Sequence, residues 1–143
     1  MIPLLVCDDS NMARKQLIRA LPPEWPVSLS QANNGEEALA LIRQGLGQVM
    51  LLDLTMPVLD GYQTLAALRA EGLSSKVIVV SGDVQDEAIR RVRELGALAF
   101  IKKPADPEIL RQTLIDLNLF DPQATPAAQA PAAALSELQV SFR

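Results

Sequence analysis

The segment from Val49 to Pro57 constrains this sequence more than any other. Four apolar residues run without interruption into Asp53, and Met56 and Pro57 follow closely. A continuous apolar run, as opposed to an alternating one, is what a parallel strand covered on both faces requires. The segment therefore predicts a buried strand of an α/β sheet that ends on a single carboxylate.

Three further apolar runs end on polar side chains: residues 3–7 before Asp8 and Asp9, 76–80 before Ser81, and 98–101 before Lys102 and Lys103. In an open α/β sheet the carboxyl ends of the parallel strands share one edge, where ligands bind. Three carboxylates at that edge repel each other and are costly to desolvate. A bound Mg²⁺ neutralises this repulsion, and in proteins Mg²⁺ commonly also binds a phosphate. Acid cluster, lysine and hydroxyl together predict a phosphoryl site.

Helical periodicity and end signals predict five helices between and after the strands. The third and fourth are expected over Gly61–Glu71 and Val84–Leu95, and a weaker strand over Val27–Ala32. Asp106, followed by Pro107 and an acid, is a helix start. Residues expected to face the core are Ala13, Leu17, Ile18 and Leu21, then Ala38, Leu41 and Ile42, then Ile109, Leu110, Leu114 and Leu117. Five strands alternating with five helices predict an α/β fold, a three-layer αβα sandwich.

These residues resemble the receiver domain of two-component response regulators, the CheY-like family. The matching residues are Asp8-Asp9, Asp53 with Met56-Pro57 and Asp60-Gly61, Ser81, and Lys103-Pro104. The resemblance covers about residues 1–120. It implies a five-stranded parallel sheet in the order 2-1-3-4-5, of flavodoxin or CheY-like type, in a cytoplasmic signalling protein.

The resemblance also implies a role for each residue. Asp53 would be the phosphoacceptor, Lys103 would neutralise the phosphoryl oxygens, Ser81 and Phe100 would form the switch, and Thr55 and Asp83 would tune the phosphate lifetime. Asp9, Asp53 and the Thr55 carbonyl would bind Mg²⁺ directly, and Asp8 through water. The switch would act on the surface of the fourth helix, fifth strand and fifth helix. Expected partners are a sensor histidine kinase or phosphotransfer protein and a downstream output domain or protein.

Other readings of these residues stay open. Asp53 could cap a turn, Asp8 and Asp9 could cap the first helix, Ser81 could be a solvated turn residue, and Phe100 could be a core aromatic. A haloacid-dehalogenase-type phosphatase also uses an Asp nucleophile with Mg²⁺, but it needs a second acid two residues on, where this chain has Thr55. A degenerate receiver that serves as a scaffold typically lacks an acid or the lysine, and neither is missing here. We therefore expect a switch, not an enzyme, that catalyses only its own phosphorylation and dephosphorylation.

Composition excludes several other classes. The length of 143 residues suits one ordinary domain, and a net charge of −4 disfavours nucleic-acid binding. The absence of histidine excludes catalytic triads and a phosphohistidine carrier. The single cysteine, Cys7, is expected to be a small buried hydrophobe. No run is long and apolar enough to predict membrane insertion.

Residues 121–143 differ from the rest. Pro122–Ala134 is almost entirely Ala, Pro and Gln, which predicts a semi-extended linker that leads to an output domain outside this chain. Residues 135–138 weakly resemble the leader of CheC-like phosphatase domains. Leu138, Val140 and Phe142 alternate with polar residues like a short strand, so they can present one apolar edge to a groove or pair with an exposed strand edge. The second strand is the natural edge for such pairing, and we expect the host to be a neighbouring molecule. That arrangement would be a self-association through the tail.

Overall fold

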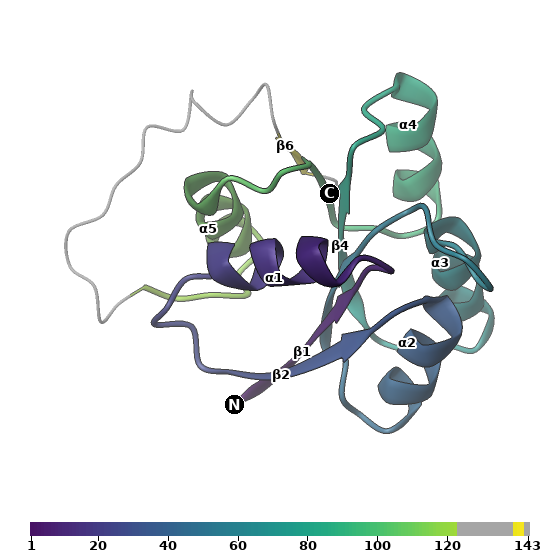
Figure 1. Cartoon of the computed structure of the whole chain (residues 1–143), viewed down its shortest axis with the longest axis horizontal. Helices are drawn as coiled ribbons and strands as arrows, with labels where there is room; N and C mark the ends of the chain where they lie inside the picture. Colours follow the sequence, from purple (N-terminus) through teal and green to yellow (C-terminus); the bar gives the residue numbers. More distant parts are fainter. Residues whose placement is uncertain (123–138, 142–143) are drawn as a thin grey trace.

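The computed structural model describes residues 1–122 and 139–141 (Figure 1). Its elements are β1 (Ile2–Cys7), α1 (Asn11–Ala20), β2 (Val27–Ala32), α2 (Gly35–Arg43), β3 (Val49–Leu52), α3 (Gly61–Ala70), β4 (Lys76–Ser81), α4 (Asp86–Glu94), β5 (Ala99–Lys102), α5 (Pro107–Asp116) and β6 (Gln139–Ser141). Within these residues, every helix is too short or too polar to cross a bilayer.

The sheet has the strand order β2-β1-β3-β4-β5-β6. Strands β1 to β5 are parallel, which confirms the predicted five-stranded sheet and its order 2-1-3-4-5. The register pairs Cys7 with Leu52, so the last residues of β1 and β3 lie side by side. Asp8 and Asp53, each the next residue, therefore leave the sheet at the same edge.

Two apolar cores cover the two faces of the sheet, which confirms the three-layer sandwich. Leu5 and Cys7 pack with α2, α3 and α4, whereas Leu4 and Val6 pack with α1 and α5. Figure 1 shows these helices in two layers on either side of the strands. Because successive strand residues point to opposite faces, a continuous apolar run fills both cores at once. This explains why β1 and β3, which lie inside the sheet, carry no polar residue until they end.

Side-chain caps fix where the helices begin. Ser10, Asn34 and Asp106 each accept a backbone N–H of the first helical turn, at α1, α2 and α5. Asp60 caps α3 and forms a capping box in which the Gln63 side chain accepts the Asp60 backbone N–H. The predicted starts of α3 and α5 agree with these caps.

Some predicted helix details are wrong. The fourth helix begins at Asp86, not Val84, and the third ends at Ala70. In α2, Leu39 is buried and Leu41 only partly so. The partly buried side chains of Leu21 and Leu117 lie just beyond the ends of α1 and α5. Each difference lies within one turn of helix, where apolar spacing alone does not fix the boundary.

The C-terminal strand pairs with a different edge strand from the one expected. β6 pairs antiparallel with β5 of its own chain, with Phe100 opposite Val140, so pairing with the second strand of a neighbouring molecule is wrong. The reason is that β5 is also an edge strand of the parallel sheet and offers the same row of unpaired backbone groups. Leu138, Phe142 and the predicted linker, apart from Pro122, lie outside the described residues.

Candidate functional site

Three carboxylates meet at the carboxyl edge of the sheet. Asp8 and Asp9 follow β1 and Asp53 follows β3, and one oxygen from each lies within 4.8 Å of the others. Asp8 and Asp53 are 2% and 7% exposed, whereas Asp9 is exposed. The Asp53 backbone N–H donates to the Cys7 carbonyl at 3.0 Å and thereby extends the β1–β3 ladder to the site. The sheet thus holds the carboxylates together despite their repulsion.

Lys103 brings the compensating positive charge. Its Nζ lies 2.7 Å from Asp8 Oδ2 and 3.2 Å from Asp53 Oδ1. Burial alone would lower the pKa of Lys103, but the hydrogen bond to Asp8 and the charges of Asp53 and Asp8 outweigh it and raise that pKa. Lys102, the last residue of β5, is exposed and forms no ion pair with the acid cluster among the described residues.

Asp53 is destabilised as an anion. Burial, and then the negative charge of Asp8, raise its pKa, against the opposing effect of Lys103. One ammonium therefore does not neutralise three clustered carboxylates. A hard divalent cation with oxygen ligands fits this donor set, and Mg²⁺ commonly takes one or two carboxylates together with water and phosphate. Asp8, Asp9 and Asp53 are the side chains that could hold it.

The loop after Asp53 packs tightly against the start of α3. The Gly61 N–H donates to the Leu54 carbonyl at 3.0 Å. A Cβ at Gly61 would lie 2.5 Å from the Asp53 carbonyl oxygen, so this position has no room for a side chain. The helix is therefore anchored directly on the backbone of the central acid. In the same loop Val58 has a φ of 68°, which is unusual for a β-branched residue.

Ser81 and Phe100 lie on adjacent strands, and both are 2% exposed. Ser81 ends β4, and its Oγ accepts the Asp83 N–H at 3.1 Å. Phe100 packs in the core on the α2, α3 and α4 side of the sheet. Thr55 and Asp83 are exposed beside the site, and no hydrogen bond among the described residues joins either side chain to the acid cluster.

Cys7 lies directly beneath the acids. Its Sγ donates to the Asn34 carbonyl at 3.3 Å and lies 3.5 Å from the Met56 sulfur. Burial, with the charges of Asp8 and Asp53, raises the pKa of the thiol to about 12. The thiol is therefore protonated at neutral pH, consistent with its expected role as a small buried hydrophobe.

Sequence reasoning missed Arg14, a buried side chain of α1 that is 6% exposed. Its guanidinium donates to the Asp8 backbone carbonyl at 2.5 Å and to Asn33 Oδ1 at 2.8 Å. The signal was present, because Arg14 precedes Leu17 by three residues and so shares the buried stripe of the helix. A search restricted to apolar positions passes over it.

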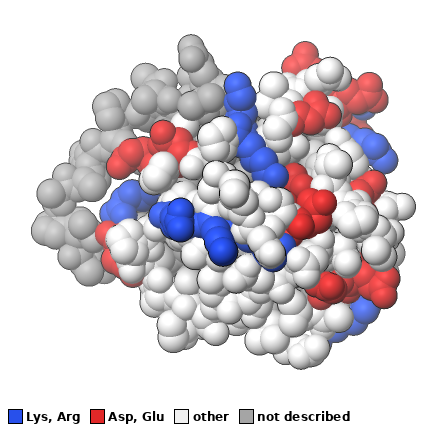
Figure 2. Space-filling model, in the orientation of Figure 1, with Lys and Arg blue, Asp and Glu red and all other residues white. Residues whose placement is uncertain are grey.

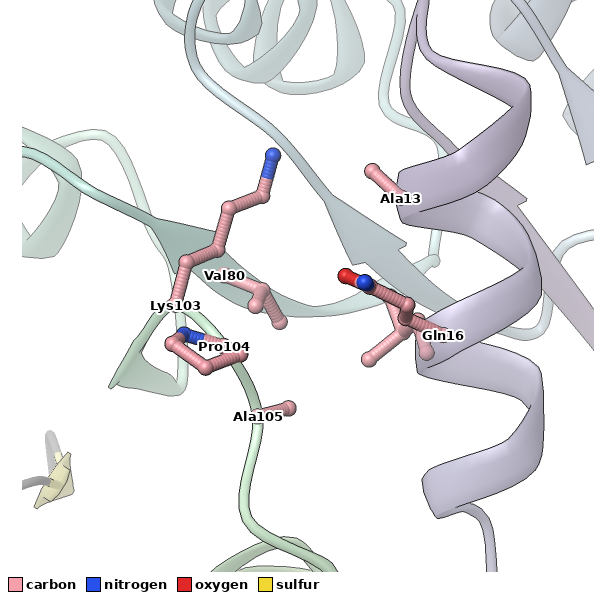
Figure 3. Close-up of a pocket in the computed structure, with 7 residues that line it drawn as sticks. Ala13, Gln16, Val80, Lys103, Pro104 and Ala105 are labelled. Atoms are coloured by element: carbon pink, nitrogen blue, oxygen red, sulfur yellow. The ribbon is translucent and has the colours of Figure 1, made fainter.

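A cavity of about 360 Å³ opens beside Lys103, between α1 and the loop before α5. It is lined by Ala13, Gln16, Leu17, Val80, Lys103, Pro104 and Ala105. Figure 3 shows the Lys103 side chain rising along one wall and the Gln16 amide facing it from α1. Figure 2 shows basic side chains gathered over α1 and acidic ones on both sides of them. The site thus has an open approach with a mixed, largely apolar wall.

Comparison with known proteins agrees with this geometry. Residues 4–115 match the family described as response regulator receiver domain. The chain is 36% identical over 119 residues to a probable C4-dicarboxylate response regulator, DctR, from Priestia megaterium, covering 82% of this chain and 51% of that protein. The chain thus spans about half the length of the curated relatives it matches, as it also does for NarL of Escherichia coli.

Two solved structures show the same fold. The receiver domain of NarL from Mycobacterium tuberculosis has a TM-score of 0.72 at 30% identity, covering 80% of this chain and 93% of that one. A chain of the CheX-CheY-BeF3-Mg²⁺ complex from Borrelia burgdorferi has a TM-score of 0.72 at 26% identity, covering 82% of this chain and 89% of that one. Fold and site thus define a CheY-like α/β domain with an acidic pocket. The chain belongs to the response regulator receiver domain family of two-component signalling.

Proposed function

We propose that this receiver domain is a Mg²⁺-dependent switch that accepts a phosphoryl group on Asp53. The observation that carries the proposal is the convergence of Asp8, Asp9, Asp53 and Lys103 at one sheet edge. The donor would be a phosphohistidine of a sensor histidine kinase or a phosphotransfer protein.

The chemistry requires little covalent participation from the protein. One Asp53 carboxylate oxygen forms a bond to phosphorus as the phosphorus–nitrogen bond of the donor breaks, and the electron pair returns to the imidazole nitrogen. Lys103, already 3.2 Å from Asp53 Oδ1, is placed to pair with a phosphoryl oxygen. Positioning and charge stabilisation of this kind are most of what phosphoryl transfer needs.

The metal ligands would be Asp9, Asp53 and the Thr55 carbonyl, with Asp8 acting through water. The oxygen-only donor set of the acid cluster supports this assignment. When bound, Mg²⁺ would supply positive charge against the phosphoryl oxygens. The Borrelia relative named above is described as a complex with Mg²⁺ and BeF3, which is in keeping with such a site.

The switch would run from Ser81 to Phe100. A phosphoryl oxygen on Asp53 would draw the Ser81 hydroxyl away from the Asp83 N–H, which it accepts at 3.1 Å. Phe100 would then shift the balance between two arrangements of the surface formed by α4, β5 and α5. Phe100 has no hydroxyl, so its packing in the core is what favours one arrangement. Beryllofluoride should move NMR signals on that surface, and shifts confined to the metal site would contradict this route.

We propose residues 1–120 as the receiver unit. The domain or protein that produces the output would lie outside these residues. The DctR and NarL relatives are about twice the matched length, so a further domain or protein is the expected recipient. Residues 121–143 would connect to it. A CheC-like phosphatase domain is one candidate, on the weak resemblance of residues 135–138.

Labelling with acetyl phosphate tests the proposal. With Mg²⁺ the chain should gain one phosphoryl group by intact mass, and Asp53→Asn should gain none. Asp86→Asn, at an exposed acid at the start of α4, is the matched control and should label normally. Labelling that persists in Asp53→Asn or in the presence of a chelator would contradict the assignment. Absence of any labelling would favour a scaffold, and continuous turnover would favour a phosphatase.

A further inference from the structure

Arg14 is a buried cation directly behind the acid cluster. Its donors reach Gln31 Oε1 at 2.9 Å, the Asp8 carbonyl at 2.5 Å, Asn33 Oδ1 at 2.8 Å, and Asn11 Oδ1. All four acceptors are uncharged, and Arg14 forms no salt bridge within the part of the chain that the structure describes. Burying a charge without an ion pair costs free energy, so a hydrophobic residue would serve the core better. The role of Arg14 therefore depends on the hydrogen bonds that its guanidinium donates.

The Asp8 carbonyl is the acceptor that connects Arg14 to the site. This carbonyl and the Asp9 nitrogen belong to one planar peptide unit, so fixing the oxygen fixes the direction in which the chain enters Asp9. The other side of Asp8 is held as well, because its N–H donates to the Ala32 carbonyl at 3.1 Å. Asp9 itself is exposed. Its carboxylate is therefore aimed by the backbone that Arg14 holds.

The same guanidinium joins this peptide to the neighbouring loop. Arg14 Nη1 donates both to the Asp8 carbonyl and to Asn33 Oδ1, and Asn33 is the residue after β2. The Asn33 backbone N–H in turn donates to Glu37 Oε1 at 2.9 Å. Gln31 lies at the end of β2. Arg14 thus ties the strand-end loops of β1 and β2 to α1. A planar fork with several donors can do this, whereas a single ammonium cannot.

Charge and geometry predict opposite effects on metal binding. A positive charge close to the acids repels a second cation, so Arg14 acting through charge alone would weaken Mg²⁺ binding. Acting through the Asp8–Asp9 peptide, it would strengthen binding by holding Asp9 in place. Partners that orient metal ligands typically change affinity by about 10- to 100-fold. The sign of the effect therefore separates the two mechanisms.

We propose that Arg14 is a positioning residue that fixes the Asp8–Asp9 peptide and so presents the Asp9 carboxylate to Mg²⁺. The inference rests on the proposed function of Asp8, Asp9 and Asp53 as the metal site. It adds a residue that touches neither metal nor phosphate. Its distinguishing consequence is that removal of a positive charge weakens the binding of a cation.

Calorimetric Mg²⁺ titration without a phosphodonor tests the inference. Arg14→Met should bind Mg²⁺ about 10- to 100-fold more weakly than the wild type. Arg14→Lys keeps the charge but loses the fork, and it should also bind more weakly. Arg19→Met removes an exposed charge from the same helix and is the matched control, with affinity unchanged or slightly higher. In the metal-free NMR spectrum of Arg14→Lys, the Asp9 and Ser10 amides should shift more than those of other loops.

The possible failures are distinguishable. Mg²⁺ binding that is unchanged or tighter in Arg14→Met overturns the positioning role. If Arg14→Met does not fold, Arg14→Lys decides in its place, and failure of both to fold would make Arg14 a purely structural residue and overturn the proposal. If the wild type binds no Mg²⁺, the proposed metal site itself is wrong.

Discussion

Lys103 and Asp8 are 95 residues apart in the sequence, yet their side chains form an ion pair of 2.7 Å. The pair joins the ends of β5 and β1 across the carboxyl edge of the sheet. The Asp8 side chain is only 3% exposed, whereas that of Lys103 is 30% exposed. The Lys103 ammonium can therefore move to another partner on the open side of the site, while the Asp8 carboxylate stays in place.

Replacement of Lys103 should separate metal binding from phosphorylation. Lys103→Met removes a cation from the acid cluster, so Mg²⁺ should bind several-fold more tightly. The rate of labelling by acetyl phosphate should fall by about 100-fold, because the charge that stabilises the transferring group is lost. Lys102→Met, on the exposed neighbouring residue, is the control and should change neither quantity. Retention of the full labelling rate in Lys103→Met would remove this lysine from the proposed mechanism.

Asp53→Asn should stabilise the metal-free protein. Burial and the charge of Asp8 raise the pKa of Asp53 above its ordinary value of 3.8, so the folded state binds this proton more tightly than the unfolded state. Stability from this group is then present at low pH and is lost as pH rises through and above that value. At pH 7 we expect the variant to gain about 1 kcal/mol, the size of a typical single-residue effect.

Thermal unfolding at several pH values checks this sign. The advantage of Asp53→Asn over the wild type should shrink as the pH is lowered and Asp53 takes up its proton, and it should narrow when Mg²⁺ is added at pH 7. A destabilised Asp53→Asn variant at neutral pH would show that the Lys103–Asp53 ion pair outweighs the repulsion between the acids.

Thr55 and Asp83 should set part of the phosphate lifetime. Both are exposed beside the site, where an attacking water would pass. Thr55→Ala and Asp83→Ala should each change the decay rate of the phosphorylated chain, and the sign for Asp83 decides whether it orients water or repels hydroxide. Loss of the phosphoryl group followed by mass spectrometry gives both rates. Two unchanged rates would show that neither residue flanks the path of water.

Val58 is a site where substitution should add stability. Its φ of 68° disfavours a β-branched side chain, and the residue is 71% exposed, so it contributes little packing. Val58→Asn should raise the free energy of unfolding by about 1 kcal/mol, because Asn tolerates this conformation. Urea denaturation should show a higher midpoint with an unchanged slope. Val84→Asn, at an exposed valine without a positive φ, is the control and should give no gain.

Truncation after Pro122 tests the contribution of β6. The loss of this three-residue strand exposes the edge of β5 but keeps every described residue of the two cores. We expect Asp53 phosphorylation to be retained and the melting temperature to fall by no more than a few degrees. A large loss of stability would make the C-terminal strand an integral part of the domain and would move the proposed boundary at residue 120.

Much of the fold was predictable because β1, β3, β4 and β5 are nearly continuous apolar runs that end at polar residues. Val27–Ala32 was predicted with its observed bounds, and the predicted cap Asp106 marks a real helix start. These signals are local: they depend on strand burial and on the unsatisfied N–H groups of a first helical turn. The meeting of Asp8, Asp9 and Asp53 followed from where parallel strands end.

The features that could not be predicted depend on contacts between distant segments. Arg14 is buried only because acceptors from the first two strand-end loops converge on it. The fourth helix starts late because Asp83 Oδ1 accepts the Gln85 N–H and holds this segment in a turn. The pairing of β6 with β5 depended on a choice between two free sheet edges, which local sequence does not decide.

Because Asp53 follows β3, we expect the backbone next to it to open slowly. β3 lies inside the sheet, between β1 and β4, and all four of its residues are buried. Such strands exchange their amide hydrogens mainly through global unfolding, whereas loops and edges exchange through small local openings. The acid is thus anchored in the most protected part of the molecule. A chemical change there is not easily relieved by local fraying, so we expect its effect to pass into the neighbouring strands β1 and β4.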